Sequence, residues 1–576
     1  MRAALFFALV LSLACGDDDG PSVLDGGPPD TGLEDAGTVE PDAGEPAFEP
    51  DVFCPGRVGC DEAGDDALFV GAARVDITPP FSETRDVLSV DVNGDAIWDP
   101  FAGDEFEDRN GNGVFDPIFI AGFGSPRPAS GIADPQWASA IVLRQNGTTI
   151  ALVSLDTFSI FLDDTDAIRA RVDAALGVDY VAACASHTHQ ASDTLGIYGL
   201  DESSSGVDPA YLEQIRDGAA RAVEQAVANL ERARIEYASF DFRDQPGGTY
   251  RYVSDARHPR IIDDHAQILR FEAVDGESPT GTDTIATWVN FGAHAEYWGT
   301  RNSRLSSDFP HHLREGVESG VVGPDGEVAG IGGITAFCEG AIGAQIGPGE
   351  IRPQTWDGVE LPRQGEETKR VVGEQFAYFV LRALDEGETE ETADLAVRTT
   401  RFFVDVQNRG FHVAILNDLF QRESFNWDPD RILVPGSNEP DVRTEIAIVD
   451  VGRMRILYMP GEVDPALFVG GYDGSYRPED VPFVDEDTAN PPDVSRAPGP
   501  PYLREEVRGA FDHVALVSLG NDQLGYILPD FDYVLDSTNP YIDEAEGDHY
   551  EETVSVGVDG WARLHDRLRV LIDYEP

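Results

Sequence analysis

Residues 148–157 read TTIALVSLDT and residues 179–185 read DYVAACA, two apolar stretches that predict buried β-strands. Between them, residues 163–176 carry apolar side chains at helical spacing. A strand, a helix and a second strand in this order are typical of α/β proteins, in which helices pack on the faces of a sheet. The segment therefore predicts an α/β fold.

The same alternation continues along the chain. We expect further strands at 233–242, 266–273, 285–293, 395–405, 444–450 and 453–459, and helices at 209–230, 309–319 and 366–384. No Pro- or Gly-rich linker clearly divides the chain after residue 66. We therefore predict one large, multi-layer catalytic domain over 67–576, with mixed sheets flanked by helices and long loops at 340–366 and 470–503.

A histidine motif follows the strand at 179–185 directly. Its residues are Ser186-His187-Thr188-His189. Side chains at positions i and i+2 of an extended segment face the same way, and functional groups in α/β sheets gather at the carboxyl ends of strands. His187 and His189 are therefore predicted to face one site, although an isolated pair of this kind is as often two hydrogen-bonded polar histidines.

Two more strand ends carry metal-ligand side chains. His294 closes the strand in TWVNFGAHAE (287–296), and Glu462 follows a Pro-Gly turn in LYMPGEV (457–463). Two histidines and a glutamate suit a catalytic zinc ion that keeps one position open for water. The chain contains no HExxH and no GxSxG motif. His311 and His312 begin a predicted helix and are expected to be a surface pair.

These motifs resemble, in order, those of the neutral/alkaline non-lysosomal ceramidases. The resemblance runs over roughly residues 67–573 and includes GAARVDITPP (71–80), SHTH, NFGAH, PGE, LGYILP (524–529) and HYEET (549–553). It implies a zinc-dependent hydrolase of the amide bond of a ceramide-like N-acyl lipid, acting through zinc-activated water in sphingolipid metabolism. Characterised ceramidases add a C-terminal immunoglobulin-like domain, which we do not expect here because the chain stops 26 residues after Tyr550.

The resemblance also implies roles for individual residues. By motif, the zinc ligands are His187, His294, Glu462 and Tyr526. His189 and Tyr550 are the implied catalytic residues, facing the substrate carbonyl.

Two acidic loops repeat 17 residues apart. Residues 91–100 read DVNGDAIWDP and residues 108–117 read DRNGNGVFDP, inside an insertion at 88–117. Oxygen side chains at loop positions 1, 3, 5 and 9 predict structural calcium sites, although paired Asx-Gly turns remain an alternative. The expected ligands are Asp91, Asn93, Asp95, Asp99, Asp108, Asn110, Asn112 and Asp116.

The N-terminus predicts export. Residues 1–15, MRAALFFALVLSLAC, resemble a bacterial lipoprotein signal in which Cys15 is lipidated, and an ordinary secretory signal is the alternative. Residues 16–66 predict an acidic, disordered tether. We therefore expect an exported, membrane-anchored lipoprotein, periplasmic or at the cell surface. In an oxidising compartment Cys54 and Cys60 could close a small loop, whereas Cys184 and Cys338 are expected to be buried free thiols.

The composition limits the classes of partner that the protein can bind. The 576 residues include 41 Lys+Arg and 106 Asp+Glu, a formal net charge of −65. Such a charge repels phosphate backbones and argues against nucleic-acid binding. The expected partners are an N-acyl substrate and, through the lipid anchor, a membrane. Two alternatives stay open: a zinc hydrolase of another N-acyl or ester substrate, and a non-catalytic, calcium-stabilised surface lipoprotein.

Overall fold

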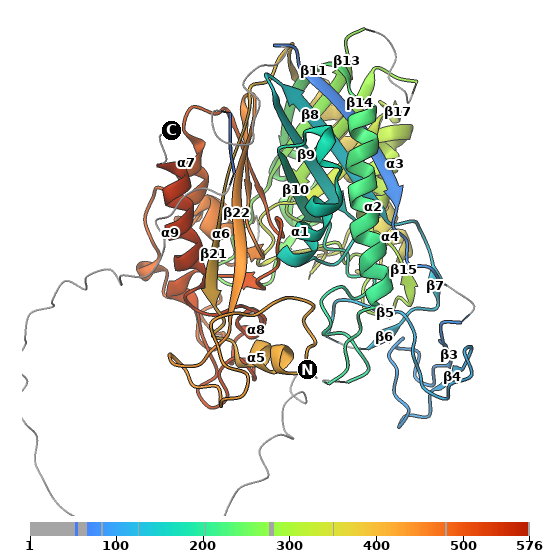
Figure 1. Ribbon diagram of the computed structural model, residues 1–576, viewed down its shortest axis with the longest axis vertical. Coiled ribbons are helices and arrows are strands. Elements are labelled where there is room, and N and C mark those ends of the chain that lie inside the picture. Colours follow the sequence, from blue (N-terminus) through green and yellow to red (C-terminus); the bar gives the residue numbers. More distant parts are fainter. Residues whose placement is uncertain are drawn as a thin grey trace, which may run out of the picture. The chain divides into compact units, whose positions relative to one another are not determined.

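Two β-sheets packed face to face organise the molecule (Figure 1). The computed structural model describes residues 52–55, 66–81, 84–124, 126–201, 203–275, 281–349, 351–478 and 481–573. The predicted signal at 1–15 with Cys15, almost all of the tether at 16–66, and Cys60 lie outside these residues. Among the described helices, none is both long and apolar enough to cross a bilayer.

The larger sheet is mixed and has nine strands within the described residues. Neighbouring strands are antiparallel except for the pairs β10–β9 and β14–β18. In spatial order its strands are β10 (Tyr180–Ala185), β9 (Thr148–Leu155), β8 (Trp137–Gln145), β2 (Phe69–Asp76), β11 (Glu231–Asp241), β13 (His265–Ala273), β14 (Thr284–Phe291) and β18 (Ile334–Glu339), and β20 (Glu388–Glu390) pairs with β11.

The smaller sheet comes from the C-terminal part of the chain and one N-terminal strand. Its only parallel pair among the described residues is β23–β25. Its order is β1 (Phe53–Cys54), β21 (Leu395–Asp405), β22 (Asp441–Val451), β23 (Met454–Tyr458) and β25 (His513–Val517).

Helices cover the outer faces of both sheets. In β9, Ile150 and Leu152 face the second sheet, whereas Ala151 and Val153 pack under helices, as the two-residue period of a strand requires. Helices α1 (Leu162–Arg171), α2 (Pro209–Ala228), α3 (Phe309–Ser319) and α4 (Glu366–Leu384) lie on the larger sheet, and α7 (Leu503–Arg508) and α9 (Gly560–Ile572) on the smaller one. The result is a four-layer α/β/β/α arrangement.

Shorter elements complete the described structure. The helices are α5 (Arg409–Leu416), α6 (Pro465–Val469) and α8 (Tyr550–Thr553). The strands are β3 (Val87–Val90), β4 (Glu105–Glu107), β5 (Phe119–Ile120), β6 (Arg127–Pro128), β7 (Gly131–Ile132), β12 (Ser254–Asp255), β15 (Arg304–Leu305), β16 (Gly320–Gly323), β17 (Gly326–Ala329), β19 (Gln345–Ile346), β24 (Glu462–Val463) and β26 (Tyr526–Ile527).

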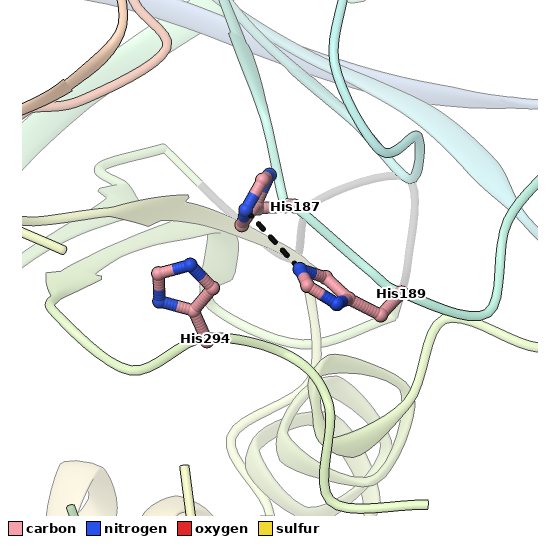
Figure 2. A group of neighbouring side chains, drawn as sticks. All are labelled: His187, His189 and His294. Atoms are coloured by element: carbon pink, nitrogen blue, oxygen red, sulfur yellow. Dashed lines mark hydrogen bonds between the residues drawn. The ribbon is translucent and has the colours of Figure 1, made fainter. Parts of the chain in front are cut away.

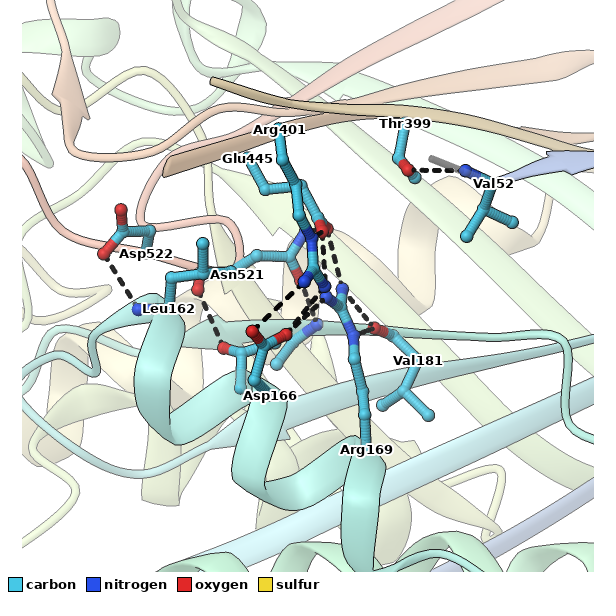
Figure 3. A network of polar contacts seen from close by, with 12 residues as sticks. Val52, Leu162, Asp166, Arg169, Val181, Thr399, Arg401, Glu445, Asn521 and Asp522 are labelled. Carbon is cyan, nitrogen blue, oxygen red and sulfur yellow. Dashed lines mark hydrogen bonds and ion pairs between the residues drawn. The ribbon is translucent and has the colours of Figure 1, made fainter. Parts of the chain in front are cut away.

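A buried ion-pair network joins the two sheets at one edge (Figure 3). The Glu445 carboxylate of β22 accepts hydrogen bonds from Arg169 Nη2 at 2.8 Å, Arg401 Nε at 2.8 Å and the Tyr180 hydroxyl at 2.6 Å. Burial alone would raise the pKa of Glu445, but Arg169 and Arg401 hold it below its usual value. A buried carboxylate shared by two arginines therefore links α1, β10, β21 and β22.

The sequence prediction of the fold class is confirmed. The structure has multiple layers, mixed sheets and flanking helices, and α3 and α4 begin and end at the predicted residues. Helix α1 ends at Arg171, and the last residues of the predicted helix, Ala174–Leu176, form a separate 3₁₀ turn capped by Asp173.

The prediction that Cys184 and Cys338 are free thiols is wrong. They form a disulfide, with sulfur atoms 2.07 Å apart. Strands β10 and β18 lie at opposite ends of the strand order, but the sheet curves until its edges meet, and Ser154 Oγ of β9 donates to Phe337 O of β18 at 2.6 Å. A contact across 154 residues of chain leaves no local signal in the sequence. The pairing of Cys54 with Cys60 stays a prediction.

Candidate metal centre

His187 enters the site from a turn rather than from an extended strand. Strand β10 ends at Ala185, and His187 has a φ of 52°, in the left-handed region. Its Nδ1 donates to Phe158 O at 2.9 Å, and the side chain is buried. This hydrogen bond fixes the ring and leaves Nε2 free to bind a ligand.

His294 is anchored in the same way. It follows β14, and its Nδ1 donates to Gln345 O at 3.0 Å. Its Nε2 lies 3.2 Å from Glu462 Oε2, and the Nε2 of His187 lies 3.5 Å from the same oxygen. Three segments that are distant in the sequence therefore place two imidazole nitrogens and one carboxylate oxygen around one point.

The Glu462 carboxylate is held in its charged form. Gln523 Nε2 donates to Oε1 at 2.9 Å, which leaves Oε2 for the histidines. Burial alone would raise the pKa of Glu462, but the imidazoles of His187 and His294 lower it well below its usual value. A buried carboxylate of this kind needs a positive partner, which protonated imidazoles or a cation can supply.

His189 is the third imidazole of the cluster. Figure 2 shows its ring together with those of His187 and His294, and all three offer ligand nitrogens within 4.8 Å of one another. His189 Nε2 lies 3.3 Å from His187 Nε2. Burial, followed by the neighbouring histidines, lowers the pKa of His189 well below its usual value. His189 is thus a neutral imidazole, and its ring faces the same site as that of His187.

Glu296 ends the motif at 287–296, and the sequence alone predicts no role for it. Its Oε2 lies 3.6 Å from His189 Nδ1, beyond hydrogen-bond distance, and Nδ1 has no hydrogen-bond partner among the described residues. Burial raises the pKa of Glu296 to about 7. Gly122, which no sequence signal singles out, also packs against this ring: a Cβ there would lie 2.6 Å from His189 Nδ1. The His189 ring therefore lies close to a carboxyl group and against a backbone position that requires glycine.

Two tyrosines complete the cluster. Strand β24 pairs in parallel with β26, and the pairing sets Tyr526 beside Glu462. The hydroxyls of Tyr526 and Tyr550 lie 3.3 Å apart. Burial, with the negative charge of Glu462 and Glu551 nearby, raises the pKa of both tyrosines well above the usual value. Both are buried, protonated phenols, and the roles that the motifs imply for them stay predictions.

An apolar cavity opens beside Glu462. Its volume is about 50 Å³, and its polar lining is limited to a few groups that include Glu462 and Gln523. Its apolar walls come from the segment after β9, from α5 and from the chain after α8. They include Phe158, Phe161, Leu195, Ile197, Val406, Phe411, Ile415, Phe420, Leu524, Val554 and Val556.

The two acidic loops belong to two similar halves of the insertion, each a short strand followed by a loop. Strands β3 and β4, which precede the loops, are antiparallel. Asp104, before β4, accepts the backbone N–H groups of Val92 and Asp99 in the first loop. Asp86, before β3, accepts those of Arg109 and Asp116 in the second. Each half thus supplies a buried aspartate to the loop of the other, a relation that the sequence repeat does not reveal.

The predicted calcium ligands lie on the inside of these loops. Asp91 accepts the backbone N–H groups of Gly94 and Ala96, and Asp108 accepts those of Gly111 and Gly113. Asn110 and Asn112 donate to Asp116. Burial and the adjacent Asp86 raise the pKa of Asp116, as two carboxyl groups in contact require.

The similarity of this chain to known proteins lies in its fold. The chain matches no model of a protein family and no curated protein. It is similar to the solved structure of neutral ceramidase from Pseudomonas aeruginosa, with a TM-score of 0.54 and 17% identity over 88% of this chain and 74% of that one. The chain has the fold of a neutral ceramidase. A ceramidase complexed with C2 matches with a TM-score of 0.52 and 16% identity, over 88% and 75% of the two chains.

The neutral ceramidase fold agrees with the resemblance found in the motifs. In this chain the fold brings together three of the four residues predicted for the zinc site and sets the backbone of the fourth beside one of them. His187, His294 and Glu462 are in mutual contact, and Tyr526 pairs with Glu462 through the backbone.

Proposed function

We propose that the protein is a zinc-dependent hydrolase that cleaves the amide bond of a ceramide-like N-acyl lipid. The observation that carries the proposal is the convergence of His187, His294 and Glu462 beside an apolar cavity. The ceramidase fold and the order of the motifs support the same reaction.

The residues present fit a zinc ion. Both imidazoles turn Nε2 toward the site because Nδ1 is bound to a backbone carbonyl, the second-sphere arrangement that metal-ligating histidines use. Nitrogen and carboxylate donors suit zinc. We assign the ligands as His187, His294, Glu462 and Tyr526, with His189 left free. Zinc bound there would supply Lewis-acid activation of water and of the amide carbonyl.

The remaining residues handle protons and the developing charge. The neutral His189 can take a proton at Nε2 and return it to the leaving amine, which is general acid–base catalysis. Glu296, 3.6 Å from Nδ1, orients the ring for this task. The Tyr550 hydroxyl, protonated because of its burial, can donate a hydrogen bond to the oxyanion that forms on the carbonyl oxygen.

The cavity supports an acyl or alkyl chain as part of the substrate. Phenylalanine, leucine, isoleucine and valine side chains make up most of its wall, and burying each methylene of a lipid chain against them contributes about 0.8 kcal/mol. A hydrolase of another N-acyl compound or of an ester would use the same site.

The proposal extends to location and to calcium. We propose an exported lipoprotein anchored at Cys15, periplasmic or at the cell surface. The Cys184–Cys338 disulfide supports an oxidising compartment. We also propose that the paired loops at 91–99 and 108–116 bind calcium in a structural role, since their oxygen side chains line the inside of each loop and Asp86 and Asp116 crowd one another.

Metal analysis combined with hydrolysis tests the proposal. The purified full chain should contain one tightly bound zinc ion, and it should hydrolyse a fluorogenic ceramide. Chelation should abolish hydrolysis, and added zinc should restore it. Hydrolysis of an ester or a short N-acyl amide instead of ceramide would shift the substrate assignment. If the chain binds calcium but no zinc, and hydrolyses none of these substrates, the proposed enzymatic function is refuted.

A further inference from the structure

Exposed apolar side chains are concentrated in two segments of the described structure. Seven of the twelve large apolar residues that are clearly exposed lie between residues 90 and 114 or between 416 and 434. Phe101 is 100% exposed and Ile432 is 87% exposed. Single exposed apolar residues are ordinary, but a concentration of this kind marks an interaction surface. The seven are Val90, Val92, Phe101, Val114, Leu416, Ile432 and Val434.

Both segments are connected along the chain to the surroundings of the proposed active site. The chain that leaves the acidic loops pairs with the chain that follows His189, since Ala121 N donates to Ala191 O at 2.9 Å and Asp193 N to Phe119 O at 2.9 Å. On the other side, Phe411 and Ile415 of α5 line the cavity beside Glu462, and Leu416 follows them directly. In Figure 1, β3, β4 and α5 lie at the same lower end of the domain.

The charges around these side chains indicate which partner they fit. Residues 86–117 contain nine acidic residues and one arginine, and residues 417–440 contain five acidic residues and two arginines. Anionic lipid and nucleic acid are repelled by such segments. A protein partner needs a continuous, complementary patch, whereas a lipid surface accepts separate apolar side chains between polar neighbours.

We propose that these two segments dock the domain onto an electrically neutral, zwitterionic lipid bilayer, with Phe101 and Ile432 entering the interface. The proposal rests on the proposed function and deepens it: the entrance to the cavity would face the bilayer from which an N-acyl lipid is drawn. This docking is independent of the proposed anchor at Cys15, because it uses side chains of the folded domain.

Vesicle binding tests the proposal. The full chain carrying Cys15→Ser, and so without an acyl anchor, is mixed with phosphatidylcholine vesicles and separated by flotation. The double variant Phe101→Ser/Ile432→Ser should bind at least about tenfold more weakly, because each side chain loses the burial of its apolar surface. The control Val322→Ser/Val359→Ser removes two valines that are 65% and 56% exposed elsewhere, and it should bind like the parent.

The outcomes separate docking from catalysis. Hydrolysis of a water-soluble N-acyl amide should be equal in the parent and both variants, while hydrolysis of a vesicle-embedded lipid should fall in the Phe101/Ile432 variant alone. No flotation of the parent, or equal flotation of both variants, would overturn the proposal. Loss of a dimer in that variant by sedimentation would also overturn it, in favour of contact between two copies. Selective flotation without any hydrolysis would support docking and refute the proposed function.

Discussion

Two groups of histidines in this protein offer the same ligand atoms in very different surroundings. His187, His189 and His294 meet at the ends of two strands of the larger sheet, whereas His311, His312 and Glu315 lie within five residues of one helix, α3. In both groups the possible ligand atoms lie within 4.8 Å of one another. Proximity alone therefore does not distinguish a metal centre.

The surroundings do distinguish them. The imidazoles of His187 and His294 are each fixed by a carbonyl through Nδ1 and turned toward a buried carboxylate beside an apolar cavity. The α3 pair is only half-buried, so its prediction as a surface pair holds in part. Burial, with the charges of His311 and Lys369, lowers the pKa of His312 to about 3. A neighbouring ammonium group also opposes a bound cation. Orientation and local charge separate the two groups.

Replacing one histidine of each group gives the largest expected contrast. His187→Ala should remove the bound zinc and lower kcat/KM at least about 10³-fold, because the Lewis-acid contribution is worth several kcal/mol. His311→Ala should leave both values unchanged. Zinc content by atomic emission and hydrolysis of a fluorogenic N-acyl substrate are the measurements. Equal effects of the two variants would mean that the groups do not differ in function.

His189→Ala sharpens the comparison inside the first group. We expect zinc content to be retained while kcat falls about 10²–10⁴-fold, the usual contribution of a general acid–base residue. His312→Ala is the matched control and should have no effect on kcat. Loss of zinc in His189→Ala would instead make His189 a ligand, as its position among the three imidazoles permits.

The disulfide tests whether the first group depends on long-range structure. Cys184 lies three residues before His187, and Cys338 lies on the edge strand that meets β10. Cys184→Ala/Cys338→Ala should lower the free energy of unfolding by roughly 2–5 kcal/mol in urea titrations. It should weaken zinc binding as well, since His187 follows the edge strand β10 and His294 follows β14, the neighbour of the other edge strand. Unchanged zinc affinity would show that the other contacts between the edges are sufficient.

Glu296→Gln should have the smallest effect of this series. We expect about a tenfold loss of kcat with zinc content and KM unchanged, because outer-sphere partners typically contribute 10–100-fold. Glu315→Gln, which alters the corresponding carboxylate near His311, is the control and should be silent. A loss of zinc in Glu296→Gln would place Glu296 in the metal centre rather than behind His189.

The residues of the site were largely predictable from the sequence, and their geometry was not. His187, His294 and Glu462 each follow a recognisable apolar strand, so pattern and order predicted their proximity. The φ of 52° at His187, the carbonyls of Phe158 and Gln345 that fix the rings, and the close approach of Gly122 have no such signal. They depend on backbone atoms, whose positions no residue type specifies.

What the sequence determined by itself is the alternation of strands and helices and the side chains available at strand ends, because periodic burial and residue chemistry are local properties. Only the tertiary structure decided that Cys184 and Cys338 meet, that Asp86 and Asp104 each bind the backbone of the other half's loop, and that two imidazoles contact Glu462. These contacts join segments that the chain order keeps apart. They form because a curved sheet packed on a second sheet brings its edges and loop ends together.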